Sequence, residues 1–301
     1  MINQEFTDIL YALEQNREAV LERRVEGNVY IRKFAQQERL ILLGAGHVSQ
    51  AVAELTAKLD FSIVVVDDRL EFVNAERFPW ADEIVCAPFP DAIENLHLCA
   101  RDYVCILTRG HRWDANCLRA ILPGDMPFYL GMIGSKHRVS AQMEQFKAEG
   151  YDLARLERIH TPIGLPIHAL TPAEIAVSIA AELILARRSC PEEKGVLDQS
   201  NADESLLRCA ANWDEPRAMI LVLEAKGSTP GKPGAIMLVD STGHTFGTVG
   251  GGASEGEALK QAKELLNTGG STVLSFDLSN EVAAKEGMAC GGSMKMLVET
   301  L

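Results

Sequence analysis

The stretch Leu40-Ile-Leu-Leu-Gly-Ala-Gly-His-Val-Ser-Gln50, followed by Ser62-Ile-Val-Val-Val-Asp-Asp-Arg69, decides the fold of the first part of the chain. One apolar run ends at Gly44-Ala-Gly46, and a second ends at Asp67, 21 residues after Gly46. This layout is typical of a dinucleotide-binding βαβ unit, in which glycines allow a tight turn and a close approach of the backbone to a phosphate. The helix that follows offers its N-terminal N–H groups to an anion. Ser49 replaces the third glycine of the usual pattern.

A fold of this type does not by itself fix a ligand. If NAD(P) or another nucleotide binds, Gly44 and Gly46 would approach its phosphates, and Asp67 would accept a hydrogen bond from a ribose 2′-hydroxyl. A carboxylate at this position argues against a 2′-phosphate, although Arg69 keeps that alternative open. His47 either faces the ligand crevice or caps the helix.

The composition is that of an ordinary globular protein whose length predicts two domains: 301 residues, 47% hydrophobic and 24% charged. A net charge of −13 argues against non-specific binding to nucleic acid or to an anionic membrane. The N-terminus has no secretory pattern, and the longest apolar stretch, 173–186, is too short to span a bilayer. Seven cysteines without a C-x-x-C pair predict reduced thiols in a cytoplasmic protein, and they argue against zinc or iron–sulfur sites.

The first domain is predicted over residues 1–188. An amphipathic helix over 5–24 precedes an alternation of strands and helices, and near-continuous apolar runs in the strands favour a parallel sheet buried on both faces. A capping box from Thr171 to Glu174 begins a helix over 173–188, whose apolar surface either packs on the sheet or forms a dimer seam. The strands are expected at 40–43, 62–66, 83–86, 102–107 and 127–132.

A polar segment without periodicity, 189–205, is predicted to be a linker to a small α+β domain over 206–301. The fold class is therefore α/β: a Rossmann-like, mostly parallel sheet domain followed by a small α+β domain. In the second domain, strands are expected at 217–224, 235–240, 245–249, 272–277 and 293–299, with a helix over 254–267.

Three glycine-rich stretches lie in the second domain, at 227–234, 247–252 and 288–292. Glycines let backbone N–H groups converge on an anion, so the three stretches either shape turns or line a shared ligand pocket. Cys290 precedes Gly291 in the third stretch. Its thiolate could ligate a soft metal or carry sulfur, or the residue could be a buried filler.

Polar clusters also follow two strands of the first domain, where open α/β sheets bind ligands. Arg109 and His111 lie in the stretch 108–114, which is either part of a site or a solvated loop. Gly134 and Ser135 begin a helix after the next strand. Glu182, in an apolar helix, is either catalytic or paired with a nearby arginine, for which Arg187 is the candidate. The chain contains no H-E-x-x-H motif.

Taken together, these stretches resemble the XdhC/CoxI family of molybdenum-cofactor accessory proteins, which serve xanthine dehydrogenase and related hydroxylases. Two departures stand out. The Rossmann-like domain comes first here, whereas the more familiar arrangement begins with the small domain, and Ala253 stands where some relatives carry a cysteine. The resemblance lies in 44–48, 66–69, 76–79, 108–112, 129–135, 162–166 and 171–178 of the first domain, and in 227–230, 233–235, 247–252, Glu255 and 290–292 of the second.

The resemblance implies a maturation factor rather than an enzyme. Such a protein would bind molybdopterin cofactor, in its mononucleotide or dinucleotide form, and support its sulfuration. It would then insert the cofactor into an apo molybdenum hydroxylase. A cysteine desulfurase and a second copy of the chain are the further partners implied, with no nucleic acid and no membrane. The competing interpretations are an NAD(P)-dependent oxidoreductase and an interaction scaffold.

The resemblance also places the cofactor in the second domain. Its phosphate would meet the helix N-terminus at Gly250, Gly251 and Gly252, beside Glu255. The metal end would lie near Cys290 and Gly291, so the cysteine is a candidate molybdenum or sulfur contact. The loop that begins at Gly227 and Ser228 would form one wall.

Overall fold

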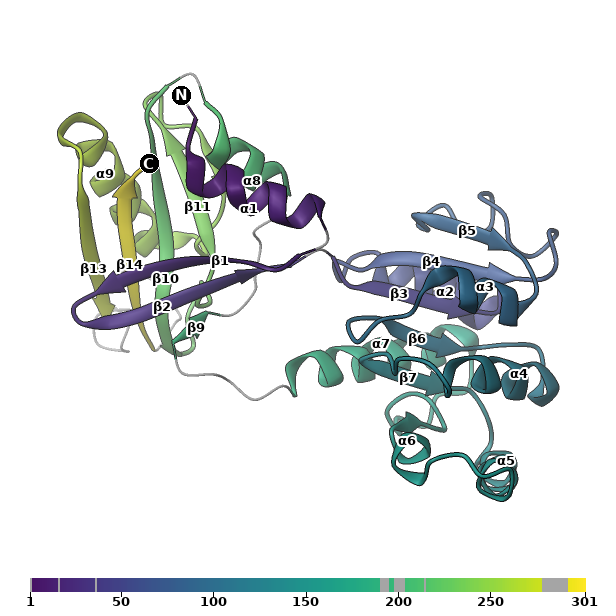
Figure 1. Cartoon of the computed structure of the whole chain (residues 1–301). Coiled ribbons are helices and arrows are strands. Elements are labelled where there is room, and N and C mark those ends of the chain that lie inside the picture. The colour runs from purple at the N-terminus through teal and green to yellow at the C-terminus, as the bar shows by residue number, and fades with distance from the viewer. Residues whose placement is uncertain are drawn as a thin grey trace. The chain divides into compact units, whose positions relative to one another are not determined.

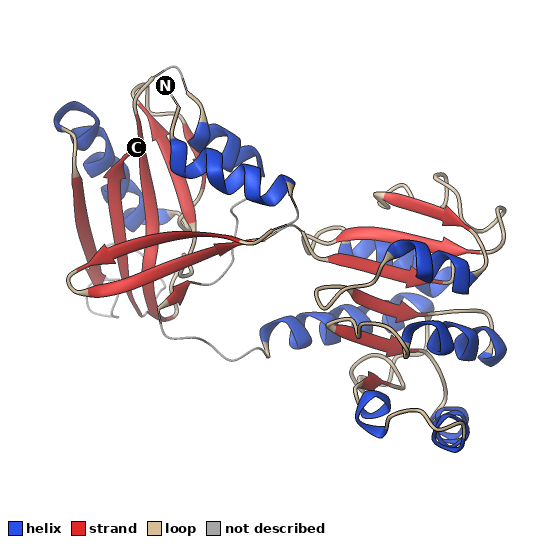
Figure 2. Cartoon of the chain, viewed as in Figure 1, coloured by secondary structure: helices blue, strands red, loops and turns tan. Residues whose placement is uncertain are grey.

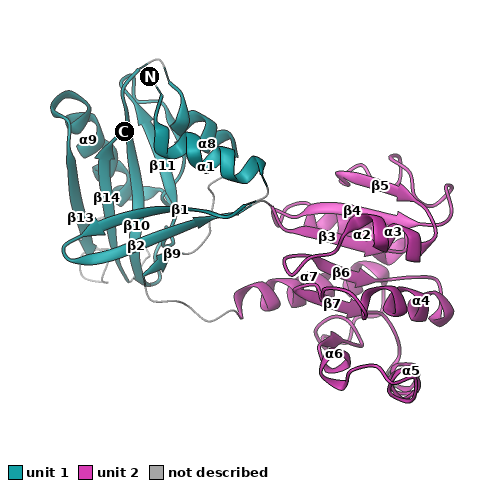
Figure 3. Cartoon of the chain, viewed as in Figure 1, with its two compact units in different colours: residues 1–36, 192–301 teal, residues 37–191 magenta. Residues whose placement is uncertain are grey.

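The chain folds into two compact units in a computed structural model that describes residues 2–15, 17–35, 37–189, 195–197, 204–213, 215–277 and 292–301 (Figures 1 and 3). Unit 1 combines residues 1–36 with 192–301, and unit 2 comprises 37–191. Each unit has its own sheets and its own buried clusters, so each is described by itself.

Unit 2 is built on a six-stranded parallel sheet with the strand order β5-β4-β3-β6-β7-β8. Numbered along the chain within this unit, the order is 3-2-1-4-5-6, which is that of the dinucleotide-binding Rossmann fold. The order reverses between β3 and β6, which places the topological switch point at the carboxyl ends of these two strands. The strands are β3 (Arg39–Leu43), β4 (Ser62–Asp67), β5 (Glu83–Cys86), β6 (Tyr103–Ile106), β7 (Tyr129–Met132) and β8 (Ile159–His160).

Helices cover both faces of this sheet (Figure 2), which explains why the strands are almost uniformly apolar. One buried cluster joins the sheet to α3, α4 and α5, and another joins it to α2 and α7. The five predicted strands are confirmed. The short strand β8 was missed because two residues give no periodic pattern. The helices are α2 (His47–Thr56), α3 (Phe89–Leu96), α4 (His111–Ile121), α5 (Lys136–Ala148), α6 (Leu153–Glu157) and α7 (Pro172–Arg188), which begins with the predicted capping box.

Unit 1 contains a five-stranded antiparallel sheet with the order β12-β11-β10-β14-β13. Helix α9 (Gly252–Thr268) packs on one face, and α8 (Glu204–Ala211) packs on the other. The strands predicted for the second domain are confirmed, as is the helix over 254–267. They are β10 (Arg217–Gly227), β11 (Ile236–Asp240), β12 (Thr245–Gly247), β13 (Ser271–Asp277) and β14 (Gly292–Thr300).

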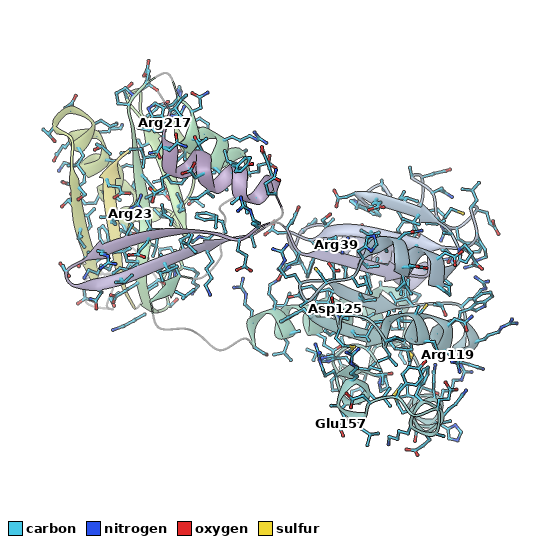
Figure 4. All side chains as sticks on the ribbon, in the orientation of Figure 1. Arg23, Arg39, Arg119, Asp125, Glu157 and Arg217 are labelled. Carbon is cyan, nitrogen blue, oxygen red and sulfur yellow. The ribbon has the colours of Figure 1, made fainter. Side chains whose placement is uncertain are left out.

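The N-terminal segment folds with unit 1, not with the Rossmann-like sheet. Helix α1 (Gln4–Glu14) buries Phe6 and Ile9 in the same cluster as the apolar residues of α8. Arg23, on β1 (Ala19–Val25), lies on this unit in Figure 4, and its Nε is 2.6 Å from Glu299 Oε1 of β14. The same guanidinium is 2.8 Å from Glu5 of α1. The domain boundaries predicted at 1–188 and 206–301 are therefore corrected for residues 2–35.

The predicted helix over 5–24 is wrong beyond Glu14, because β1 and β2 (Asn28–Phe34) form an antiparallel hairpin. Glu26 and Gly27 both have positive φ, as the two central residues of a type I′ hairpin turn require. Leu21 and Val25 are buried while the residues between them are more exposed, which is the alternation of a strand. β2 also pairs with β9 (Val196–Leu197), and the predicted linker lies largely outside the described residues.

Across the part of the chain that the structure describes, none of the helices combines the length and apolar character needed to cross a bilayer.

Candidate functional site

The first glycine-rich stretch of unit 1 contacts both the second stretch and Gly292, the described residue of the third, at one end of the antiparallel sheet. Gly227, at the end of β10, pairs with Gly292, at the start of β14. A Cβ on Gly292 would lie 2.3 Å from the carbonyl oxygen of Lys226 and 3.0 Å from that of Ser228. The first stretch and Gly292 therefore touch through their backbones, and a side chain at Gly292 would push them apart.

The first and second stretches interlock in the same way. A Cβ on Gly231 would lie 2.1 Å from the carbonyl oxygen of Val249, and a Cβ on Gly250 would lie 2.3 Å from the backbone nitrogen of Gly231. Such distances are far below van der Waals contact, so only glycine fits at either position. Among the described residues, the first and second stretches are thus held together by close backbone contacts.

Glu255 fills the backbone-amide cradle of the second stretch. Its Oε2 accepts hydrogen bonds from the N–H groups of Val249 and Gly251, each at 3.1 Å, and from the Thr248 hydroxyl at 2.9 Å. Glu255 lies in the first turn of α9, so its charge also complements the positive end of the helix dipole. The side chain is half-buried and has no cationic partner among the described residues. The anion that this loop holds in the structure is thus the chain's own carboxylate.

Gly251 and Gly252 differ from the interlocked glycines. Their φ angles are +78° and +74°, and nothing lies within 4 Å of a Cβ built on either residue. Glycine is needed here for backbone conformation, and the open space beside the loop leaves room for a ligand. Gly227 and Ser228, in the first stretch, are exposed. Cys290 and Gly291, the predicted metal or sulfur contact and its neighbour, lie outside the described residues.

In unit 2 the first glycine turn lies at the topological switch point. Gly44 has φ +113°, and a Cβ there would lie 2.4 Å from the carbonyl oxygen of Leu107, just beyond β6. Gly46 is the N-cap of α2, with open space around it. His47 follows and is exposed, so it does not pack into the core. The turn and the end of β6 thus come together, as the fold predicts.

Asp67 is buried and engaged by its own chain. Its side chain is 1% exposed. One carboxylate oxygen, Oδ2, accepts a hydrogen bond from Ala45 N at 2.8 Å, and Arg69 donates to both oxygens from Nε at 2.8 Å and Nη2 at 3.0 Å. The Asp67 carboxylate therefore links the end of β4 to the glycine turn.

Arg109 and His111 follow β6 as predicted. The Arg109 guanidinium makes a bidentate ion pair with Asp68 and lies 4.1 Å from the Trp113 ring centroid. Hydrogen bonds from Arg109 lower the pKa of the Asp68 carboxyl. His111 begins α4 and is exposed. Gly134 and Ser135 lie between β7 and α5, where Ser135 is the N-cap but makes no capping hydrogen bond through its side chain.

Asp114, in the first turn of α4, is buried beneath this loop. It accepts a hydrogen bond from the Thr108 hydroxyl at 2.5 Å. Burial raises the pKa of Asp114 to about 6, since the charged carboxylate is removed from water. The residue ties the start of α4 to the end of β6, so its role is to fix the loop.

Glu182 does not pair with Arg187, which instead contacts Glu38 at 2.7 Å. The Glu182 carboxylate accepts hydrogen bonds from Tyr129 Oη at 2.5 Å and from Gly164 N at 2.7 Å, and His160 Nδ1 lies 3.3 Å from it. Burial works to raise the pKa of Glu182, but these partners outweigh it and the pKa is lowered. Glu182 therefore anchors the segment after β8 to α7.

Two arginines lie beside the glycine turn: Arg69, which the sequence linked to a ribose 2′-phosphate, and Arg77, which was not among the predicted site residues. Arg69 lies 3.8 Å from the Phe72 ring centroid, and Arg77 lies 5.3 Å from the same centroid. Arg77 also donates to the carbonyl oxygen of Ala45, at 3.4 Å. The signal for Arg77 was present in the stretch Glu76-Arg-Phe-Pro79, which contributed to the family resemblance but gave no indication of a role.

Within the described ranges, no three histidine, cysteine, aspartate or glutamate side chains gather closely enough to hold a metal ion. This finding does not extend to Cys290.

Comparisons with known proteins find two family matches, one in each unit. Residues 40–183 match the XdhC Rossmann domain, and residues 210–277 match the XdhC and CoxI family. The chain is 33% identical over 165 residues to the uncharacterized protein YqeB of Escherichia coli (strain K12), a match that covers 54% of this chain and 30% of that protein. It is 29% identical over 162 residues to a probable xanthine dehydrogenase subunit of Bacillus subtilis (strain 168), covering 54% and 46% respectively.

The chain therefore spans less than half the length of either of these curated relatives. Among solved structures, a xanthine dehydrogenase from Bacillus halodurans is 29% identical, with a TM-score of 0.49, over 56% of this chain and 48% of that one.

Proposed function

Because the chain belongs to the XdhC and CoxI family, with its Rossmann domain first, we propose that it binds molybdenum cofactor during the maturation of a xanthine dehydrogenase-type hydroxylase. Family membership and the name of the Bacillus subtilis relative support the accessory role. The observation that carries the cofactor proposal is the close backbone contact of the first glycine-rich stretch of unit 1 with the second stretch and with Gly292.

The residues of this site fit an anionic, phosphate-bearing group. Gly251 and Gly252 leave open space at the N-terminus of α9, which favours an anion. The cradle formed by Val249 N, Gly251 N and the Thr248 hydroxyl already holds the carboxylate of Glu255, so it has the donor geometry that a phosphate oxygen needs. Ser228 and Gly227 would line the other side. When bound, the cofactor would supply the molybdenum that the client enzyme uses.

In this proposal the chain itself catalyses no reaction. Its residues would bind the cofactor, shield it from water and hold it for sulfuration, with sulfur supplied by a cysteine desulfurase. Cys290 is the proposed contact with the metal or its sulfur, because it is the cysteine within a glycine-rich motif. The client would be an apo molybdenum hydroxylase, and the working form would be a homodimer.

The proposal is tested by purifying the full chain from cells that synthesise molybdenum cofactor and measuring oxidised pterin fluorescence and molybdenum content. We expect about one pterin per chain in the unchanged protein. Gly251→Ala should remove most of it. Gly269→Ala is the matched control, because Gly269 ends the same helix with a φ of +71° and equally open surroundings. Equal pterin content in the two variants would overturn the assignment of the phosphate site, and the absence of pterin from all of them would overturn cofactor binding.

The role of Cys290 has its own test. Cys290→Ser should lower molybdenum content or the activation of an apo-hydroxylase added to the protein, whereas Cys86→Ser, at an exposed free cysteine of unit 2, should change neither. No difference between these two variants would remove the cysteine from the mechanism and leave the glycine site standing.

A further inference from the structure

We propose that the crevice at the switch point of unit 2 binds a nucleotide whose ribose carries a phosphate, such as NADP⁺, with Arg69, Arg77 and Arg109 as the groups that recognise it. The proposal goes beyond the function proposed above, which concerns unit 1. It starts from the observation that Asp67, the expected ligand of a ribose hydroxyl, is buried and fully engaged by Ala45 and Arg69.

Asp67 is buried, whereas the guanidinium groups of Arg69 and Arg109 are 26% and 31% exposed beside it. Arg69 and Arg109 lie together at the carboxyl ends of β4 and β6: Arg69 Nε is 2.8 Å and Arg109 Nη1 is 3.9 Å from the same oxygen of Asp67. Arg69 and Arg77 lie over the same ring, that of Phe72. The three cations thus form one cluster, drawn from three separate places in the sequence.

The cluster also reaches the glycine turn where a nucleotide would lie. Arg77 Nη2 is within 3.4 Å of the carbonyl oxygen of Ala45, between Gly44 and Gly46. Among the residues that the structure describes, Arg77 forms no ion pair, so its charge is not neutralised locally. Two acids, Asp67 and Asp68, face the cluster directly, and Glu71 acts on Arg109 from farther away.

The geometry of these side chains favours a phosphate over a hydroxyl. Arginine presents a planar fork of N–H donors that matches phosphate oxygens, and the rings of Phe72 and Trp113 hold the guanidinium planes in place. The carboxylate at the usual position for accepting a ribose hydroxyl, that of Asp67, is 1% exposed, and the neighbouring carboxylate of Asp68 is already paired with Arg109. Dinucleotide-binding folds that accept a ribose 2′-phosphate use an arginine close to this position.

The experiment is isothermal titration of the full chain with NADP⁺, NAD⁺ and inorganic phosphate. We expect NADP⁺ to bind at least tenfold more tightly than NAD⁺, and Arg77→Gln and Arg109→Gln each to remove most of that preference. Arg119→Gln is the matched control: Arg119 (labelled in Figure 4) also pairs with a carboxylate, that of Glu149, and lies over an aromatic ring, that of Phe146. It should leave the preference unchanged.

Equal affinity for NADP⁺ and NAD⁺, or no binding of either, would overturn the proposal. Competition by inorganic phosphate at the same concentration as NADP⁺ would also overturn it, because it would indicate a simple anion site. Arg69 is left intact in this test, since its removal would strand the buried charge of Asp67 and could unfold the unit. Pterin content, measured on the same preparations, keeps this outcome separate from that of the cofactor site in unit 1.

Discussion

The glycine turn of unit 2 and the glycine-rich loop of unit 1 both donate backbone N–H groups to a carboxylate of their own chain, but the two carboxylates sit in different surroundings. Asp67 is 1% exposed and shares its charge with Arg69, whereas Glu255 is half-buried and has no cationic partner among the described residues. A buried ion pair is costly to break, while a half-exposed carboxylate can exchange its partners for water. Asp67 is therefore a fixed part of the fold, and Glu255 occupies a place that a ligand could take.

The largest effect is expected from Asp67→Ala. The change would leave the Arg69 guanidinium without its main partner and the N–H of Ala45 unsatisfied. Removing one partner of a buried pair costs about 3–5 kcal/mol, so the free energy of unfolding of unit 2 should fall by that amount. Urea unfolding followed by circular dichroism measures it. A loss below about 1 kcal/mol would show that Asp67 is replaceable and that the contrast with Glu255 is false.

The second prediction compares the loss of stability at a closely packed glycine, Gly250, with that at a glycine in open surroundings, Gly251. Gly250→Ala would drive a Cβ to 2.3 Å from the backbone of Gly231 at a φ of +113°, so backbone strain and overpacking together should cost about 2–4 kcal/mol. Gly251→Ala carries the strain alone, because its surroundings are open, and should cost about 1–2 kcal/mol. Thermal unfolding of both variants measures this difference. Similar losses of unfolding free energy in the two variants would contradict the close backbone contact between the two stretches.

A third prediction concerns pH. Because burial raises the pKa of Asp114 to about 6, above its value in the unfolded chain of about 3.9, the folded state binds this proton more tightly. Stability from this group is therefore present below about pH 4 and is lost as the pH rises to about 6. Asp114→Asn keeps an acceptor for Thr108 and should stabilise unit 2 by about 1–2 kcal/mol at pH 8.

The comparison that checks this prediction is the same pair of proteins at pH 4 and pH 8. The advantage of Asp114→Asn should shrink toward zero at the lower pH, where the aspartate is itself protonated. An advantage of the same size at both values would mean that packing, and not charge, separates the two proteins.

The parallel sheet and the glycine-rich stretches could be predicted from the sequence because their signals are local. Apolar runs such as 62–66 indicate buried strands wherever they occur, and glycines mark the turns between them. The position of the N-terminal segment could not be predicted, since it depends on contacts between Phe6 and residues about 200 positions away in α8. A short hairpin also offers few residues from which to distinguish a strand from a helix.

The roles of the Asp67 and Glu255 carboxylates could not be predicted from the sequence either. Asp67 and Glu255 stand at the positions where a family of nucleotide-binding or cofactor-binding loops would carry a ligand contact, and nothing in the sequence tells whether an acid there faces a ligand or its own backbone. Only the hydrogen bonds to Ala45 in one unit and to Gly251 in the other decide this. The glycines indicated where a site could form, and the arrangement of side chains around them decided which groups are available.

The smallest effect on stability, and the sharpest test of the contrast, is expected from Glu255→Gln. The amide keeps one acceptor oxygen for Gly251 N but loses the charge, so the free energy of unfolding should fall by no more than about 1 kcal/mol. Pterin retention should then rise, because an incoming phosphate no longer competes with a carboxylate for the same N–H groups. If retention falls instead, Glu255 contacts the cofactor directly, and the carboxylates of the two units would differ in function as well as in burial.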